Sequence, residues 1–146
     1  MLERQNIKPE PILKDDAPWI KPLYVECFGK EDPWLERLQD SKYEAYQVNK
    51  KAFIFTSTVG DQTDLLTIGV DKETRKQGLG SILLNWIIDK APAGQKIFLD
   101  VECQNTAAIN MYKKFGFESI SIRKGYYLQD DGTALDALVM AYQKAA

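Results

Sequence analysis

The feature that most constrains the fold is a change of hydrophobic period near the middle of the chain. Residues 65–70 form an apolar run that is typical of a buried strand. After the polar residues 71–77, apolar side chains recur at helical spacing at Leu79, Ile82, Leu83, Trp86 and Ile87. Pro92-Ala93-Gly94 ends that pattern, and residues 96–102 again have the character of a strand. This order of strand, helix and strand predicts a parallel pair of strands, because a crossover helix returns the chain to the same end of the sheet.

The segments on either side of this unit predict further strands and one further helix. Short polar turns separate three runs rich in β-branched and aromatic residues, at 43–48, 52–59 and 64–70. This spacing is typical of an antiparallel meander. Asn105 is placed to begin a second amphipathic helix, which Gly116 would end. Two last strands are expected at 117–124 and 135–142, joined by a loop that contains Asp130-Asp131-Gly132.

The first 41 residues have signals for helix ends rather than the alternation of a strand. Asp15 and Asp16 are suited to cap a helix that runs toward Phe28, and Pro22 is expected to kink or split that helix. Asp32-Pro33 resembles an N-cap followed by a proline in the first turn of a second short helix. We therefore expect a mixed α+β fold in a single domain of residues 1–146, with a sheet that is antiparallel first and partly parallel in its second half.

Composition excludes several functional classes. No histidine is present, which rules out Ser-His-Asp and Cys-His catalysis and removes the commonest metal ligand; with only two cysteines, no metal site is expected. The net charge of -2 gives no basic footprint for nucleic acid, and no apolar run approaches the ~18 residues that span a bilayer. Residues 1–6 lack a secretory pattern, so we expect a cytoplasmic protein. The oligomeric state is not predicted.

The turn that opens the central helix has the outline of a phosphate-binding site. Gly78-Leu79-Gly80 follows a charged stretch that contains Arg75 and Lys76. Backbone N–H groups at a helix N-terminus are unpaired and favour anions, and glycines let a ligand approach the backbone. The sequence has neither the Gly-Lys-Ser/Thr of a Walker loop nor the third glycine of a dinucleotide fingerprint. The alternative is that the two glycines only form a turn from strand to helix.

Two motifs give the chain a specific resemblance. The run Arg75-Lys76-Gln77-Gly78-Leu79-Gly80 matches the R/Q-x-x-G-x-G/A motif of the GNAT acyltransferases, and residues 105–117 resemble the family's N-x-x-A-x-x-x-Y-x-x-x-G-F signature. The tail from Arg123 to Met140 is similar to one subgroup, the ribosomal-protein-alanine N-acetyltransferases. The resemblance implies a GNAT-like fold with helices on both faces of the sheet and a parallel strand pair that splays apart to form a cleft for CoA.

The resemblance also implies an enzyme, an N-acetyltransferase that uses acetyl-CoA as co-substrate. The strand before the turn would offer backbone groups to the pantetheine arm, and the turn would hold the pyrophosphate. Asn105 would contact the pantetheine arm or act as a plain helix cap. The implied cofactor-binding residues are Ile68, Gly69, Val70, Arg75, Lys76, Gln77, Gly78, Leu79, Gly80, Ser81, Asn105 and Tyr112.

The implied catalytic residues are Asp100, Tyr112 and Glu102. Tyr112 matches the family's tyrosine, which protonates or hydrogen-bonds the leaving CoA sulfur, or else it is an aromatic core residue. Asp100 stands where the subgroup usually has Glu. Strand alternation places Glu102 on the same side as Asp100, so either carboxylate could be the base that deprotonates the acceptor amine, or both could be solvated charges.

The acceptor implied by the resemblance is the N-terminal amine of a protein, such as a ribosomal protein, attacked directly in a ternary complex. The Tyr126-Tyr127 pair and the loop through Asp131 are candidates for the wall that binds this peptide. Two alternatives remain open at this point. The chain could acetylate a small amine or a lysine side chain, or it could be a non-catalytic acyl-CoA-binding module that has lost its base.

Overall fold

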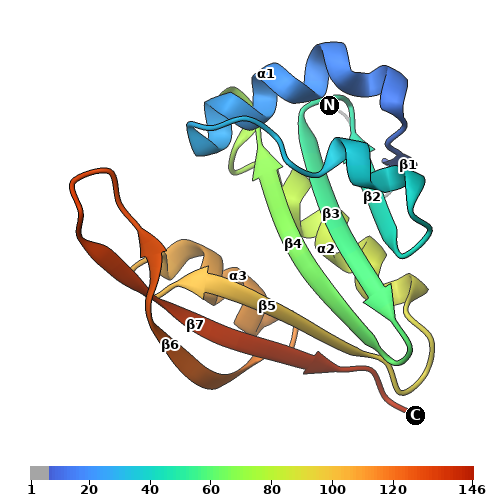
Figure 1. Cartoon of the computed structure of the whole chain (residues 1–146). Coiled ribbons are helices and arrows are strands. Elements are labelled where there is room, and N and C mark those ends of the chain that lie inside the picture. The colour runs from blue at the N-terminus through green and yellow to red at the C-terminus, as the bar shows by residue number, and fades with distance from the viewer. Residues whose placement is uncertain (1–6) are drawn as a thin grey trace. The chain divides into compact units, whose positions relative to one another are not determined.

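The computed structural model describes residues 7–146, and the chain forms a mixed sheet with helices (Figure 1). The seven strands pair in the order β1-β2-β3-β4-β5-β7-β6. The strands are β1 (Glu10–Pro11), β2 (Tyr43–Val48), β3 (Ala52–Val59), β4 (Gln62–Val70), β5 (Lys96–Glu102), β6 (Glu118–Leu128) and β7 (Ala134–Gln143). The α-helices are α1 (Ala17–Phe28), α2 (Leu79–Lys90) and α3 (Thr106–Lys114), and three short 3₁₀ turns cover Lys14–Asp16, Leu35–Gln39 and Lys72–Thr74. The predicted α+β class is confirmed.

The chain divides into two compact units. The first unit holds the described residues up to Val59 together with Leu65–Ala91, and the second holds Gly60–Asp64 and Pro92–Ala146. Strand β4 begins in the second unit and continues into the first.

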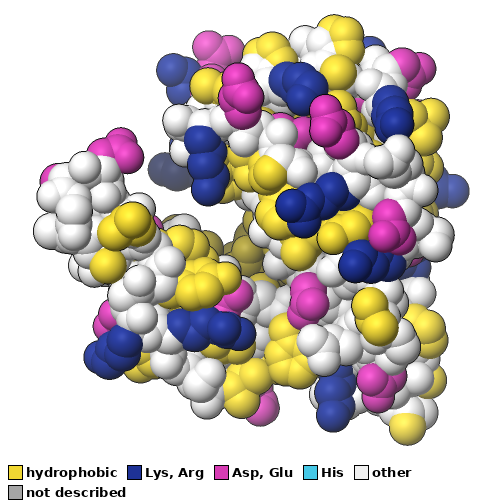
Figure 2. All heavy atoms as spheres, viewed as in Figure 1, with side chains coloured by type: hydrophobic (Ala, Val, Ile, Leu, Met, Phe, Trp, Pro, Cys, Tyr) yellow, Lys and Arg dark blue, Asp and Glu magenta, His cyan; other side chains and the backbone are white. Residues whose placement is uncertain are grey.

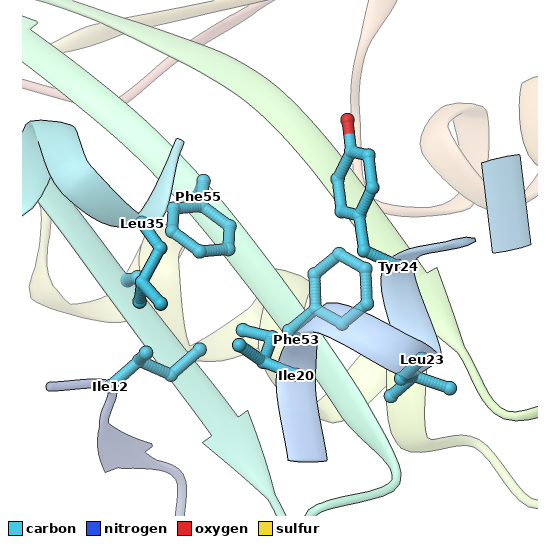
Figure 3. Packing of buried hydrophobic residues seen from close by; sticks show 8 residues of the cluster. Ile12, Ile20, Leu23, Tyr24, Leu35, Phe53 and Phe55 are labelled. Carbon is cyan, nitrogen blue, oxygen red and sulfur yellow. The ribbon is translucent and has the colours of Figure 1, made fainter. Parts of the chain in front are cut away.

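The core of the first unit forms between α1 and the strands β2 and β3. Phe53 and Phe55 lie two residues apart on one face of β3 and are at most 1% exposed. They pack with Ile20 and Tyr24 of α1, and the Tyr24 and Phe53 rings stack at 5.7 Å (Figure 3). Helix α2 lies against the opposite face of these strands, so helices cover both faces in this unit (Figure 1).

The second unit contains the parallel pair that the sequence predicts. Gln62–Asp64 of β4 runs parallel to β5 over three residue pairs, and β7 runs antiparallel to β5 along the whole strand. Strand β6 pairs antiparallel with β7 and is irregular between Arg123 and Tyr127. Aromatic contacts hold helix α3 in place. The centre of the Phe117 ring lies 5.7 Å from that of Tyr112 on α3 and 5.6 Å from that of Tyr142 on β7.

Three predicted elements differ from the structure. Helix α1 continues through Pro22 and is not split, although Pro22 lacks the N–H group that would bond to the carbonyl of Pro18. The predicted second helix is a 3₁₀ turn at Leu35–Gln39 whose N-cap is Trp34 and not Asp32. The Asp32 carboxylate instead accepts from the N–H groups of Trp34 and Leu35 as the chain enters this turn. Strand β6 extends to Leu128, four residues further than predicted, since the hairpin with β7 carries the pairing onward.

Charged side chains of both signs are interspersed over the face of the molecule seen in Figure 2. That face therefore shows no basic stripe of the kind that binds nucleic acid. Within residues 7–146, no helix has both the length and the apolar character needed to cross a lipid bilayer. The same part of the chain contains no cluster of side chains suited to hold a metal ion.

Candidate functional site

The candidate phosphate turn lies in the first unit and has an unusual backbone. Lys76 and Gly78 both adopt left-handed conformations, with φ of 70° and 82°. Gly78 is the N-cap of α2, and the first hydrogen bond of the helix runs from the N–H of Ile82 to the carbonyl of Gly78. A helix of this kind leaves the N–H groups of Leu79, Gly80 and Ser81 without helical partners. The turn thus presents several amide donors at the positive end of a helix dipole.

The side chains around this turn suit a pyrophosphate group. The Leu79 side chain is 5% exposed and anchors the helix in the core, so Leu79 can offer a ligand only its backbone. Arg75 and Lys76 supply positive charge beside the free amides. Gly78 tolerates its left-handed backbone without strain, and Gly80 presents no side chain over the amides. Backbone donors, local cations and open glycines together fit the phosphates of CoA.

The end of β4 next to the turn is engaged by two side chains of the first unit. The Val70 carbonyl accepts a hydrogen bond from Nε of Arg75 at 3.2 Å and a weak one from the Cys27 thiol at 3.5 Å. Burial is the largest influence on Cys27 and raises the pKa of its thiol, so this group is not an activated nucleophile. Among the strand residues predicted to contact the pantetheine arm, Val70 therefore has a carbonyl that already accepts hydrogen bonds from within the protein.

Asp100 and Glu102 lie on one face of β5 in the second unit, as alternation predicts. The Asp100 Oδ1 atom is buried and lies 3.1 Å from Nε of Arg123 on β6. This contact has the distance of an ion pair but not the alignment of a hydrogen bond, and among residues 7–146 that oxygen has no hydrogen-bond partner. The Asp100 carboxylate, whose side chain is 28% exposed, therefore keeps acceptor capacity beyond its ion pair.

Tyr112 of α3 lies in the core of the second unit and is 5% exposed. Burial raises the pKa of its phenol to about 12, and the neighbouring Tyr127 adds to this shift. Tyr127 also has a pKa raised to about 12, first by burial and then by the charges of Asp100 and Glu102. Tyr127 thus lies within electrostatic reach of both carboxylates and of Tyr112. A phenol with such a pKa stays protonated at neutral pH and keeps a proton to donate.

Asn105 is the N-cap of α3, as predicted. Its Oδ1 atom accepts a hydrogen bond from the N–H of Ala108 at 3.2 Å. Its side-chain amide nitrogen has no partner within the described residues and remains able to donate to a ligand.

The structure thus groups the predicted site residues in two sets. The strand and turn residues 68–70 and 75–81 belong to the first unit, and Asp100, Glu102, Asn105 and Tyr112 belong to the second. The structure adds Arg123 to the second set, and it places Tyr127, one of the tyrosines predicted to bind the peptide, within reach of the same carboxylates. The sequence alone gave Arg123 no role in the site. The proximity of Arg123 to the carboxylates becomes visible only in the strand register. Strand β7 lies between β5 and β6, and Arg123 and Glu102 pair with Ala137 from its two sides.

A turn with free backbone amides and a strand that bears two carboxylates are compatible with the acyltransferase that the motifs predict. The model of the Acetyltransferase (GNAT) family matches residues 19–117. The chain is 35% identical over 128 residues to the [ribosomal protein bS18]-alanine N-acetyltransferase of Escherichia coli K12, covering 81% of this chain and 86% of that protein. It is 38% identical over 129 residues to the N-alpha-acetyltransferase RimI of Mycobacterium tuberculosis, covering 80% and 81% of the two chains.

Solved structures give the same result. The crystal structure of the Escherichia coli ribosomal-protein-S18-alanine N-acetyltransferase superposes with a TM-score of 0.82 at 29% identity, covering 96% of this chain and 95% of that one. Arabidopsis thaliana NAA60 in complex with acetyl-CoA shares the fold, with a TM-score of 0.78 at 18% identity and coverage of 94% and 98%. The chain belongs to the GNAT family of acetyltransferases, whose co-substrate is acetyl-CoA.

Proposed function

We propose that this enzyme transfers the acetyl group of acetyl-CoA to the α-amine of a protein N-terminus, and that the acceptor is a ribosomal protein with an N-terminal alanine. The observation that carries the proposal is the similarity to two curated N-terminal acetyltransferases over about four fifths of the chain. The family model and the structural match both extend across the two units, which supports a single acetyltransferase domain of residues 1–146. Ribosomal proteins are made in the cytoplasm, so we place the reaction there.

The binding role falls to the strand and turn residues of the first set, together with Asn105 of the second set. In this proposal Ile68, Gly69 and Val70 offer backbone groups to the pantetheine arm, and Asn105 donates its amide hydrogens. The turn of residues 75–81 holds the pyrophosphate through the free amides at the start of α2, with Arg75 and Lys76 balancing charge. Because the Val70 carbonyl already accepts from Arg75 and Cys27, its N–H group is the backbone group that Val70 offers to the pantetheine arm.

The acid–base role falls to Asp100 and Tyr112. An α-ammonium with a pKa of ~7.7–8.0 loses its proton far more readily than a lysine near ~10.4, which favours an N-terminal acceptor. Asp100 takes that proton, the neutral amine attacks the thioester carbonyl, the carbon–sulfur bond breaks, and Tyr112 donates its proton to the departing sulfur. Asp100 is favoured over Glu102 as the base because it stands at the position where the subgroup usually has its glutamate.

The proposal is tested by CoA release from acetyl-CoA. The acceptors are a peptide with a free N-terminal alanine, the same peptide with a blocked N-terminus, a polyamine and free lysine. We expect release that depends on the free peptide N-terminus. Release with the polyamine or lysine alone would move the acceptor to a different class, and the absence of release with every acceptor would overturn the proposed activity.

The role of the turn is tested separately by the Gly80→Glu substitution. A carboxylate over the free amides should block the phosphates, so acetyl-CoA should no longer raise the melting temperature of this variant. The matched control is Asn85→Glu, which adds the same charge to an exposed position of the same helix. Protection that persists in Gly80→Glu would contradict the assignment of the turn.

A further inference from the structure

Arg123 on β6 contacts Asp100, and neither the sequence motifs nor the family match gives Arg123 a role. Arg123 and Asp100 come from strands that are not neighbours, because β7 lies between β5 and β6. Across β7, the register aligns Arg123 with Ala137 and Ala137 with Glu102. The Arg123 guanidinium nevertheless contacts the carboxylate of Asp100, which lies two residues before Glu102 on β5, and the distance from Nε to Oδ1 is 3.1 Å.

The local packing explains how this diagonal contact forms. Ala137 is fully buried and presents only a methyl group, so the Arg123 side chain can cross β7 above it. The guanidinium carbon lies 5.5 Å from the centre of the Tyr126 ring, a distance at which a cation and an aromatic face attract each other. Tyr126 in turn meets the ring of Tyr127 edge to face at 5.0 Å. The Arg123 guanidinium therefore contacts the Tyr126 ring and the Asp100 carboxylate.

Arg123 orients the Asp100 carboxylate without using up the hydrogen-bond acceptor capacity of its Oδ1 atom. The ion pair places a cation beside Oδ1, but the poor alignment leaves the acceptor capacity of that oxygen unused. The Asp100 side chain is 28% exposed, so the carboxylate is partly screened from water, and Glu102 lies two residues along the same face. The positive charge of Arg123 favours one orientation of the Asp100 carboxylate although the Glu102 carboxylate is nearby.

We propose that Arg123 is a positioning residue that holds the carboxylate of Asp100 in the orientation needed to accept the proton of the acceptor amine. This inference rests on the proposed function. Arg123 would serve the same reaction by orienting Asp100, without touching either substrate. Because the Arg123 side chain is 56% exposed, its value lies in geometry and not in stability.

The test is a double-mutant cycle on the rate of transfer to the free-N-terminus peptide. Arg123→Met should lower kcat about 10-fold, leave the binding of acetyl-CoA unchanged and change KM for the peptide little, as expected for a residue that acts on a proton transfer. Arg123→Lys keeps the charge but loses the planar group over Tyr126, and should recover part of the rate. In an Asp100→Asn background, Arg123→Met should cause no further loss. Lys124→Met, which removes a neighbouring cation from its pair with Asp136, is the matched control and should keep full activity.

Two outcomes decide against the inference in different ways. An equal fold-loss from Arg123→Met in the wild-type and Asp100→Asn backgrounds would show that Arg123 acts independently of Asp100, which overturns the positioning role while leaving the proposed function standing. Absence of transfer by the wild type would overturn the proposed function itself. The positioning role rests on that function and would fall with it.

Discussion

Gly69 of β4 lies directly against the ring of Phe53 on the neighbouring strand β3. A Cβ atom at Gly69 would overlap Cζ of that ring and would lie 2.8 Å from Cε2. Phe53 is fully buried and is held by Tyr24 and Phe28 of α1, so its ring has no free space to move into. The glycine is therefore required for packing in the first unit, whatever contact its backbone makes with a ligand.

Replacing Gly69 with alanine should lower the free energy of unfolding by about 1–3 kcal/mol, the usual cost of overpacking a core. The measurement is urea unfolding of both proteins. The Phe53→Leu substitution shortens the side chain that causes the overlap, so the double variant should lose less stability than the two single losses added together. Strict additivity would show that the two sites do not share this contact.

Asp100 and Glu102 are distinguished by paired amide substitutions. Asp100→Asn should lower kcat about 100-fold with the peptide acceptor, while Glu102→Gln should change it less than about 3-fold, since Asp100 stands at the position of the subgroup's usual glutamate. The opposite ranking in steady-state rates would make Glu102 the base. Asp100→Glu, which restores the longer side chain usual in the subgroup, should remain active.

Tyr112 is expected to act through its hydroxyl group. Tyr112→Phe keeps the ring packed against Phe117 and should lower kcat about 10-fold or more without weakening acetyl-CoA binding. Tyr142→Phe is the matched control, because Tyr142 also packs on Phe117 and has no assigned role in the reaction. Equal rates for wild type and Tyr112→Phe would leave Tyr112 as a core residue only.

The raised pKa of Tyr112 also predicts how stability depends on pH. In the unfolded chain the phenol ionises near 10, whereas in the fold its pKa is about 12, so the unfolded state loses this proton first. The contribution is complete below pH 10 and is lost as pH rises through 12, which amounts to roughly 1.4 kcal/mol by pH 11. Urea unfolding between pH 8 and pH 11 should show a shallower decline for Tyr112→Phe than for wild type. Parallel curves would contradict the burial of this phenol.

Much of the fold is encoded locally and is predictable from the sequence. Strands β2, β3 and β5 have the predicted bounds, because each contains β-branched and aromatic residues and ends at a polar turn or a glycine. Gly78 and Asn105 begin α2 and α3 as predicted, since caps depend on the residue at one position. Strand β1 escapes prediction because two residues are too short to show a period.

The environment of Asp100 depends on longer-range structure. Its contact with Arg123 requires the registers of two strand pairs and a small residue at Ala137, none of which a linear pattern contains. The position of Tyr127 depends on the irregularity of β6 after Arg123. The sequence motifs therefore predict the candidate carboxylates and tyrosines by type, while the contacts that differentiate Asp100 from Glu102 appear only in the three-dimensional structure.

The central claim is that this chain acetylates the N-terminal amine of a protein, and mapping the product tests it most directly. The wild-type enzyme is incubated with acetyl-CoA and a peptide that carries both an N-terminal alanine and an internal lysine, and the modified residue is located by tandem mass spectrometry. A single acetyl group on the alanine amine is the predicted result. An acetyl group on the lysine side chain, or an unmodified peptide, would contradict it.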